Sequence, residues 1–274
     1  MSEAEALYIR DGEAFVGTAC TQGAWGHGGQ AGGAVLALLG HVLEDVPTLT
    51  PMSLTRLTVD ILRPVPVGQR LDVATEVVRE GKKIQVVDLL IRAGDEVTTR
   101  ARALRIRDRD VAGVEGLPIS TTGLNPSASV PPPEELSGVD QIPSAPAFLK
   151  HACELRRTLE PVDGVHVVWT RLRIPVVAGE PLRAASRAAA PLDLVNMMGV
   201  RLDKRRVTSI NPDVTGNLCR APVGEWVALT GHTYYSHDVA HGVSMAVMSD
   251  EAGVFGVTST SQILDVLEVG DADE

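Results

Sequence analysis

Hydrophobic and polar residues alternate over several long runs of the chain, most clearly in Lys83–Arg92. Such alternation, rich in β-branched residues, is typical of antiparallel strands with one buried face. The segment Ala31–Glu44 is instead apolar on nearly every side until His41, which predicts a helix that is buried all round. In the first half, this helix is expected to accompany the strands Ala6–Arg10, Ala14–Thr18, Met52–Val65, Arg70–Arg79, Lys83–Arg92 and Glu96–Arg107.

The same order of elements returns in the second half of the chain. A strand that ends at Arg63 and a turn at Gly68 are echoed by Arg220 and Gly224, and the two arginines are 157 residues apart. A repeat of roughly 110–120 residues is a whole domain, since solenoid and propeller repeats are far shorter. The second half is predicted to contain strands Leu149–Leu159 and His166–Ile174, a helix Ala184–Gly199, and strands Thr208–Cys219, Trp226–Tyr235, Gly242–Met248 and Gly253–Val266.

Periodicity disappears between the two halves. Residues 111–146 carry seven of the 17 prolines, which is typical of an extended linker. The sequence therefore predicts an N-terminal unit over 1–110, a proline-rich linker over 111–147 and a C-terminal unit over 148–274. Each unit is expected to be an α+β domain in which an antiparallel sheet curls around its own buried helix.

Composition and charge limit the classes of function. A net charge of −10 argues against non-specific nucleic-acid binding, which needs a basic surface. The three cysteines, Cys20, Cys153 and Cys219, form neither a disulfide framework nor a zinc pattern, so a reduced cytoplasm is expected. We expect no signal peptide, and the longest small-residue apolar stretch is about half of a membrane span. We therefore expect a soluble, cytoplasmic protein without a membrane partner.

Several motifs in the two halves carry a family resemblance. The first half has Trp25-Gly-His-Gly-Gly-Gln-Ala-Gly-Gly at the helix start and Arg63-Pro64 at a strand end. The second half has Asp213 seven residues before Arg220, and Ser259-Thr-Ser-Gln262 on the last strand. In this order and spacing, the chain resembles the double-hotdog acyl-CoA thioesterase II family. The resemblance implies two tandem hotdog units, each an antiparallel sheet wrapped around a long central helix.

The resemblance also implies an activity and the residues that carry it. In that family, an Asp, a Gln and a Thr of the second hotdog hold the water that hydrolyses an acyl-CoA to a carboxylic acid and CoA. These positions fall on Asp213, Gln262 and, in place of Thr, Tyr235, for which Ser236 or Thr233 could substitute. Asp213 would accept the proton of the water and Gln262 would orient it. No cofactor and no metal is expected, and fatty acid metabolism is the expected context.

The glycine-rich helix start suits the stabilisation of an oxyanion. Backbone amides of Gly28, Gly29 and Gln30 would point at the thioester oxygen, since a helix N-terminus favours negative charge. His27 lies at the same mouth and could contact the ligand. The glycines occur only in the first half and the Asp and Gln pair only in the second. A single composite site between the two units is therefore expected.

Other interpretations remain open at this stage. The chain could be a non-catalytic acyl-CoA or lipid-binding protein or, less readily, a hotdog hydratase. Asp213 could simply cap a turn, Gln262 could face solvent, and the glycines could serve a tight turn. The histidines near Tyr235 make a poor metal site, because His237 and His241 would lie about 13 Å apart on a strand. The sequence leaves open whether the chain forms a homo-oligomer.

Overall fold

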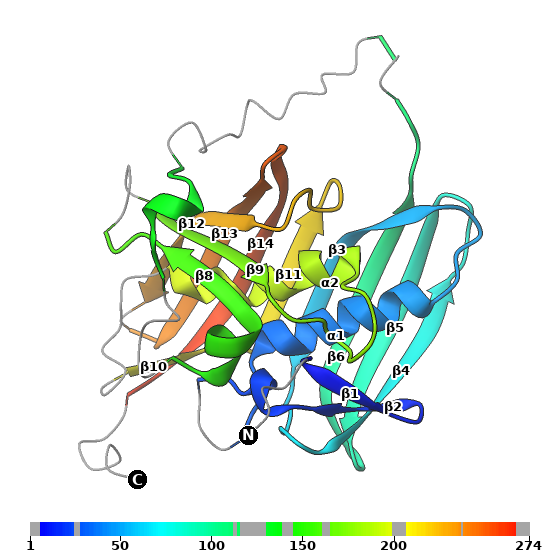
Figure 1. Ribbon diagram of the computed structural model, residues 1–274, viewed down its shortest axis with the longest axis horizontal. Helices are drawn as coiled ribbons and strands as arrows, with labels where there is room; N and C mark the ends of the chain where they lie inside the picture. Colours follow the sequence, from blue (N-terminus) through cyan, green and yellow to red (C-terminus); the bar gives the residue numbers. More distant parts are fainter. Residues whose placement is uncertain are drawn as a thin grey trace.

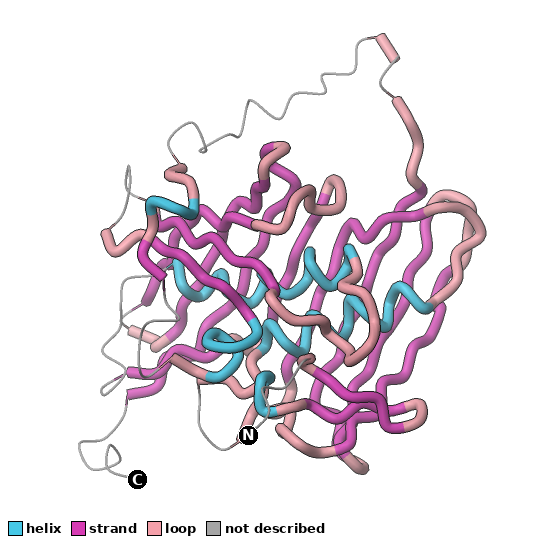
Figure 2. Tube along the Cα trace, viewed as in Figure 1, coloured by secondary structure: helices cyan, strands magenta, loops and turns pink. Residues whose placement is uncertain are grey.

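The computed structural model describes residues 6–24, 28–111, 114–115, 130–138, 145–160, 165–198, 207–236 and 238–266. Its strands join into one large, antiparallel sheet that curves around the helices (Figures 1 and 2). The strands are β1 (Tyr8–Asp11), β2 (Ala14–Gly17), β3 (Met52–Ile61), β4 (Arg70–Arg79), β5 (Ile84–Ala93), β6 (Glu96–Arg107), β7 (Ser137–Gly138), β8 (Cys153–Arg157), β9 (His166–Leu172), β10 (Val207–Ile210), β11 (Asp213–Leu218), β12 (Val227–Ser236), β13 (His241–Asp250) and β14 (Gly253–Val266).

The strand order shows how the two halves are related. It runs β1-β2-β4-β5-β6-β3-β11-β14-β13-β12-β9-β8-β7, with β10 paired to β14. Outward from the β3–β11 junction, β6, β5, β4, β2 and β1 on one side correspond to β14, β13, β12, β9 and β8 on the other. At the junction itself, Thr58 lies directly opposite Thr215. These threonines are 157 residues apart, as expected for two repeats that meet on a pseudo-twofold axis.

The first predicted helix is present as α1 (Gly32–Asp45), and its side chains are buried along most of its length. Its glycines allow a close contact with the second half. A Cβ atom built on Gly40 would lie only 2.6 Å from the carbonyl oxygen of Ala185. Figure 1 shows α1 beside α2 (Ala184–Ala189) in the middle of the molecule. The cost of glycine in a helix is thus offset by the approach of two helices.

The second helix differs from the prediction of one helix over Ala184–Gly199. The α-helix ends at Ala189 and continues as the 3-10 helix η6 (Ala190–Met198). Pro191 has no N–H to donate and its ring crowds the preceding turn, which explains the change of helix type. Gly199 lies outside the described residues.

The segment before the second half also differs from the predicted linker. Its described residues 130–138 contain the short 3-10 helix η4 (Pro133–Glu135) and β7, which pairs with β8. The Trp169 indole N–H donates to the carbonyl oxygen of Pro131 at 2.9 Å, which fixes this part to the second half. The start of the predicted strand Leu149–Leu159 is the π-helix η5 (Phe148–Ala152). A 3-10 turn, η1 (Ala19–Thr21), precedes α1.

One predicted strand, Thr208–Cys219, is divided into β10 and β11 by an irregularity at Asn211-Pro212. The pairing with β14 runs Ile210 to Ile263 before this step and Thr215 to Ser259 after it, so one extra residue lies between. This is a β-bulge, and a proline is tolerated there because it has no N–H for the ladder. The bulge decides which side chains of the strand face the interior.

Candidate functional site

The bulge separates the two residues that were expected to share a water. On β11, Val214, Gly216 and Leu218 are buried, so Asp213 lies on the outer face of the sheet. Gln262 of β14 lies on the inner face and is only 2% exposed. Asp213 accepts a hydrogen bond from the Ser261 backbone N–H at 2.8 Å. The structure therefore does not bring Asp213 and Gln262 together, because a one-residue slip moves a side chain to the other face.

Gln262 lies in a polar cluster on the inner face of the second half. Its Nε2 donates to Ser244 Oγ at 2.7 Å, and its Oε1 accepts from Ser209 Oγ at 2.9 Å. The Thr233 hydroxyl lies 2.5 Å from the Ser244 hydroxyl. Two serines thus fix the orientation of the amide. One N–H and one oxygen lone pair of Gln262 remain for another partner.

Tyr235 belongs to the same cluster. It faces Gly242 across the β12–β13 pairing, and Gly242 faces Gln262 on β14. A Cβ atom on Gly242 would lie 2.8 Å from the Tyr235 ring, so the glycine makes room for it. Burial raises the pKa of Tyr235, although hydrogen bonds with Ser209 and Thr233 partly oppose this rise. Of the expected catalytic side chains, Tyr235 and Gln262 are therefore neighbours linked through Ser209.

A carboxylate that the sequence analysis missed lies at the start of α1. Asp193 of η6 accepts a hydrogen bond at Oδ2 from the Gly33 backbone N–H, at 3.0 Å. Its Oδ1 accepts another from Asn211 Nδ2, also at 3.0 Å. A Cβ atom on Gly32 would lie 2.5 Å from Asp193 Oδ1, so glycine is required for this approach. The site joins the helix start of the first half to a carboxylate of the second.

The electrostatics of Asp193 differ from those of a surface carboxylate. Burial raises its pKa above the ordinary value, while the hydrogen bonds from Asn211 and Gly33 act in the opposite direction. The positive end of α1 also favours the ionised form. The residue as a whole is half-buried, and each of its two carboxylate oxygens accepts a hydrogen bond from the protein. A partly buried carboxylate with a raised pKa is typical of a proton acceptor in an enzyme.

Asn211 connects this carboxylate to the Gln262 cluster. The β10–β14 pairing ends where Ile210 lies opposite Ile263. Asn211 and Gln262 are the residues that follow on the two strands. Asn211 is 7% exposed. Its Oδ1 has no hydrogen-bond partner in the part of the chain that the structure describes. A buried amide oxygen without a partner is costly, which points to a water or a ligand at this position.

The glycine-rich turn before α1 is held by its own hydrogen bonds. The Gln30 N–H donates to the Val65 carbonyl at 2.8 Å, and its side chain bonds Pro66 O and the Tyr8 hydroxyl. The amide of Gln30 is therefore engaged and not available to an oxyanion. Gly28 has a φ of +69°, which only glycine adopts readily. His27 lies outside the described residues.

The first half contains a related carboxylate at the start of the other helix. Glu44 Oε1 accepts from the Ala185 N–H of α2 at 2.6 Å, much as Asp193 accepts from Gly33. By the 157-residue spacing, Asp193 corresponds to Leu36 and not to Glu44, so the two contacts are similar in kind but are not equivalent positions of the repeat. The two positions differ in the residues around them.

Arg105 occupies the position of Gln262 in the first half, 157 residues earlier. Its guanidinium is 6% exposed and donates to the carbonyl oxygens of Leu43, at 3.1 Å, and Val46, at 2.7 Å. It also donates to the Gln85 side chain. These bonds satisfy the last turn of α1, so the polar position of the first half is used for stability. The arrangement favours a single site, in the second half.

Across the described ranges, no group of three or more His, Cys, Asp or Glu side chains is placed to hold a metal ion. His237, one of the histidines considered above, lies outside those ranges. None of the described helices is long and apolar enough to cross a membrane.

Comparisons with known proteins identify the family of the two halves. Residues 21–106 match the model of the acyl-CoA thioesterase N-terminal domain, and residues 128–264 match that of the C-terminal domain. No curated protein matches the sequence.

Solved structures of low sequence identity share the fold. A conserved hot dog fold protein from Alicyclobacillus acidocaldarius has a TM-score of 0.68 at 19% identity, over 97% of this chain and 98% of that one. The tesB protein of Mycobacterium avium subsp. paratuberculosis has a TM-score of 0.63 at 16% identity, covering 94% and 95%. The acyl-CoA thioesterase II TesB2 of Mycobacterium marinum has a TM-score of 0.62 at 13% identity, covering 93% and 94%. From the two domain matches, which span most of its length, the chain belongs to the acyl-CoA thioesterase family.

Proposed function

We propose that this protein hydrolyses an acyl-CoA to a carboxylic acid and free CoA, with Asp193 as the base. The observation that carries the proposal is the carboxylate of Asp193, held between the start of α1 and Asn211 beside Gln262. Family membership supports thioester hydrolysis in general. The assignment of Asp193 replaces our expectation for Asp213, which faces away from this cluster.

In the proposed reaction, a water lies against Asn211 Oδ1 and within reach of Asp193 and Gln262. Asp193 takes a proton from the water as its oxygen attacks the thioester carbonyl carbon. The tetrahedral intermediate then collapses, the carbon–sulfur bond breaks, and the CoA thiolate recovers the proton from Asp193. Water is the nucleophile, so the reaction needs no cofactor.

The oxyanion of the intermediate requires hydrogen-bond donors. The second N–H of Gln262 is one candidate, because only one of its two is engaged by Ser244. The amides of Gly28 and Gly29 remain candidates at the helix mouth, and His27 remains a candidate contact for the ligand. We assign Tyr235 a positioning role, since it reaches Gln262 through Ser209.

We also infer that the halves are two hotdog units, with the division at 1–110, 111–147 and 148–274. The strand order on either side of β3 and β11 supports this inference. An acyl-CoA substrate, a place in fatty acid metabolism, a cytoplasmic location and assembly into a homo-oligomer remain parts of the proposal.

A thiol-release assay across acyl-CoAs of increasing chain length tests the proposal. We expect release of one CoA per acid formed, with a preferred chain length. Binding of acyl-CoA without thiol release at any chain length would contradict hydrolysis and favour the non-catalytic binding protein.

A further inference from the structure

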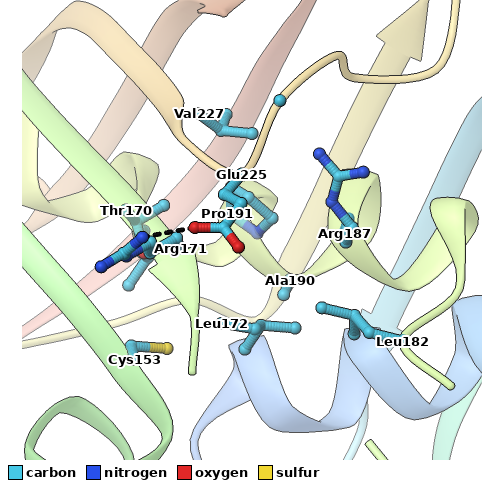
Figure 3. A pocket seen from close by; sticks show the side chains of 12 residues that line it. Cys153, Thr170, Arg171, Leu172, Leu182, Arg187, Ala190, Pro191, Glu225 and Val227 are labelled. Carbon is cyan, nitrogen blue, oxygen red and sulfur yellow. Dashed lines mark hydrogen bonds and ion pairs between the residues drawn. The ribbon is translucent and has the colours of Figure 1, made fainter. Parts of the chain in front are cut away.

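A cavity of about 210 Å³ lies between the second-half sheet and the helical segment α2–η6 (Figure 3). Its walls come from β8, β9 and β12, from α2 and η6, and from the loop before β12. Asp193, Asn211 and Gln262 are not among its lining residues. The cavity is therefore a separate feature of the second half, beside the candidate active site.

The charge of the lining is unbalanced. Two arginines, Arg171 and Arg187, and one acidic residue, Glu225, line the cavity. Arg171 donates to both Glu154 and Glu225, so its charge is compensated. Figure 3 shows this pair at one side of the cavity and Arg187 projecting from α2 at another. The lining thus carries one positive charge in excess.

The Arg187 guanidinium holds one nitrogen atom that no described residue satisfies. Its Nη2 is buried, and no described residue accepts a hydrogen bond from it. A buried guanidinium nitrogen without an acceptor is costly, and carboxylates are well matched to its geometry. A bound anion would satisfy this nitrogen and neutralise the excess charge.

Apart from Thr170, the remaining lining residues are apolar, and they determine what else the ligand carries. Leu172, Leu182, Leu194 and Val227 contribute aliphatic surface. An engineered cavity of about 150 Å³ binds benzene, which has six heavy atoms, so 210 Å³ has room for about eight. A carboxylate with a chain of about four to six carbons has this size.

We infer that this cavity binds a short-chain aliphatic carboxylate, whose oxygens pair with Arg187 and whose chain packs against the leucines. Two lining residues, Pro191 and Leu194, flank Asp193 on η6. A bound acid would therefore add contacts to the turn that carries the proposed base. The binding itself does not depend on hydrolysis and can be measured without a thioester.

A ligand-detected NMR titration with sodium butyrate, hexanoate and octanoate tests the inference. We expect saturable binding that tightens about fourfold for each added CH₂ up to hexanoate. The gain should stop at octanoate, because about ten heavy atoms exceed the space. An affinity that keeps rising through octanoate would overturn the inference, because the chain would then lie on an open surface.

Substitutions separate the roles of charge and shape. Arg187→Gln should weaken hexanoate binding at least about tenfold, since hydrogen bonds to charged groups are among the strong ones. Leu182→Phe keeps the guanidinium but fills the chain site, so it should also weaken binding. The matched control is Arg63→Gln, which removes an equal charge at a site that is 64% exposed and paired with Glu96. It should bind hexanoate as the wild type does, and circular dichroism checks that each variant is folded.

Neutral and inorganic probes complete the test. 1-Hexanol, which has the chain but no charge, should bind at least about tenfold more weakly than hexanoate. Inorganic phosphate should not displace hexanoate at equal concentration. Equal binding of hexanol, displacement by phosphate, or unchanged hexanoate binding in folded Arg187→Gln would each overturn the assignment.

Discussion

Replacement of Glu180 by glutamine should lower the free energy of unfolding by an amount that depends on pH. The Glu180 carboxylate connects three parts of the fold, because it contacts Arg10 of β1 at 2.5 Å, His41 of α1 at 2.9 Å and Arg183 at 3.0 Å. Arg183 also donates to the His41 carbonyl oxygen. The hydrogen bond from Arg10, opposed by burial and assisted by His41, lowers the pKa of Glu180 from 4.5 to about 2.

The size of the effect follows from this shift in pKa. A difference of roughly 2.5 units at 1.36 kcal/mol per unit corresponds to about 3 kcal/mol. The side chain is 22% exposed, and solvent screens the pairs, so we expect about 1–2 kcal/mol. The pKa of Glu180 is lower in the folded state than in the unfolded state. Its contribution to stability is therefore complete above about pH 4.5 and is lost as the pH falls towards 2.

Urea unfolding, followed by tryptophan fluorescence, measures this contribution. At pH 7, Glu180→Gln should unfold with a free energy about 1–2 kcal/mol below the wild type, and the gap should narrow between pH 4.5 and 3.5. The matched control is Glu96→Gln, whose carboxylate is 59% exposed and pairs with Arg63, and which should change little. A gap that stays constant from pH 7 to 3.5 would refute the reasoning, because it would show that packing and not charge is responsible.

Three further results are expected. Gly40→Ala, which would favour an isolated helix, should lower the free energy of unfolding by about 1–3 kcal/mol, because the added Cβ meets Ala185 O at 2.6 Å; a higher urea midpoint would contradict this contact. Gln262→Ala should lower the thiol-release rate at least about tenfold in a folded protein, since it removes an oriented amide; an unchanged rate would exclude a role. The pKa of Asp193, raised above 3.8, predicts that thiol release falls as the pH is lowered towards that pKa, and a flat profile down to pH 4 would count against Asp193 as the base.

The strands were predictable because the alternation of hydrophobic and polar residues that defines each strand is local in the sequence. Alternation along each strand sets the buried face, so the predicted bounds of Arg70–Arg79, Glu96–Arg107 and Gly253–Val266 agree with β4, β6 and β14. The 157-residue repeat predicted two equivalent halves, and Thr58 and Thr215 meet at that spacing. The change to a 3-10 helix at Pro191 also has a local cause, the missing N–H of the proline, which the prediction of one helix over Ala184–Gly199 did not take into account.

The polar site was harder to predict, because one extra residue at the β-bulge decides which side chains of the strand face the interior. Asp213 was chosen from the family resemblance, by its spacing of seven residues from Arg220, whereas the bulge at Asn211-Pro212 turns Asn211 inward. The proline was a visible signal of that break.

The sequence analysis also missed Asp193. The sequence does show an acidic residue within the apolar stretch of Ala184–Gly199. Such a residue is a signal, because a buried carboxylate needs hydrogen-bond partners. Those partners, Gly33 and Asn211, lie 160 and 18 residues away, and no local pattern connects them.

Thiol release by Asp193→Asn, compared with Asp213→Asn, tests the central claim most directly. Asparagine at 193 keeps the size and an oxygen for the Gly33 N–H but cannot take a proton, so the rate should fall at least about a hundredfold. Asp213→Asn changes a side chain on the outer face of the sheet, so this variant should hydrolyse acyl-CoA at a rate close to that of the wild type. A loss of activity in Asp213→Asn, with near wild-type release in Asp193→Asn, would contradict the account and return the base to Asp213.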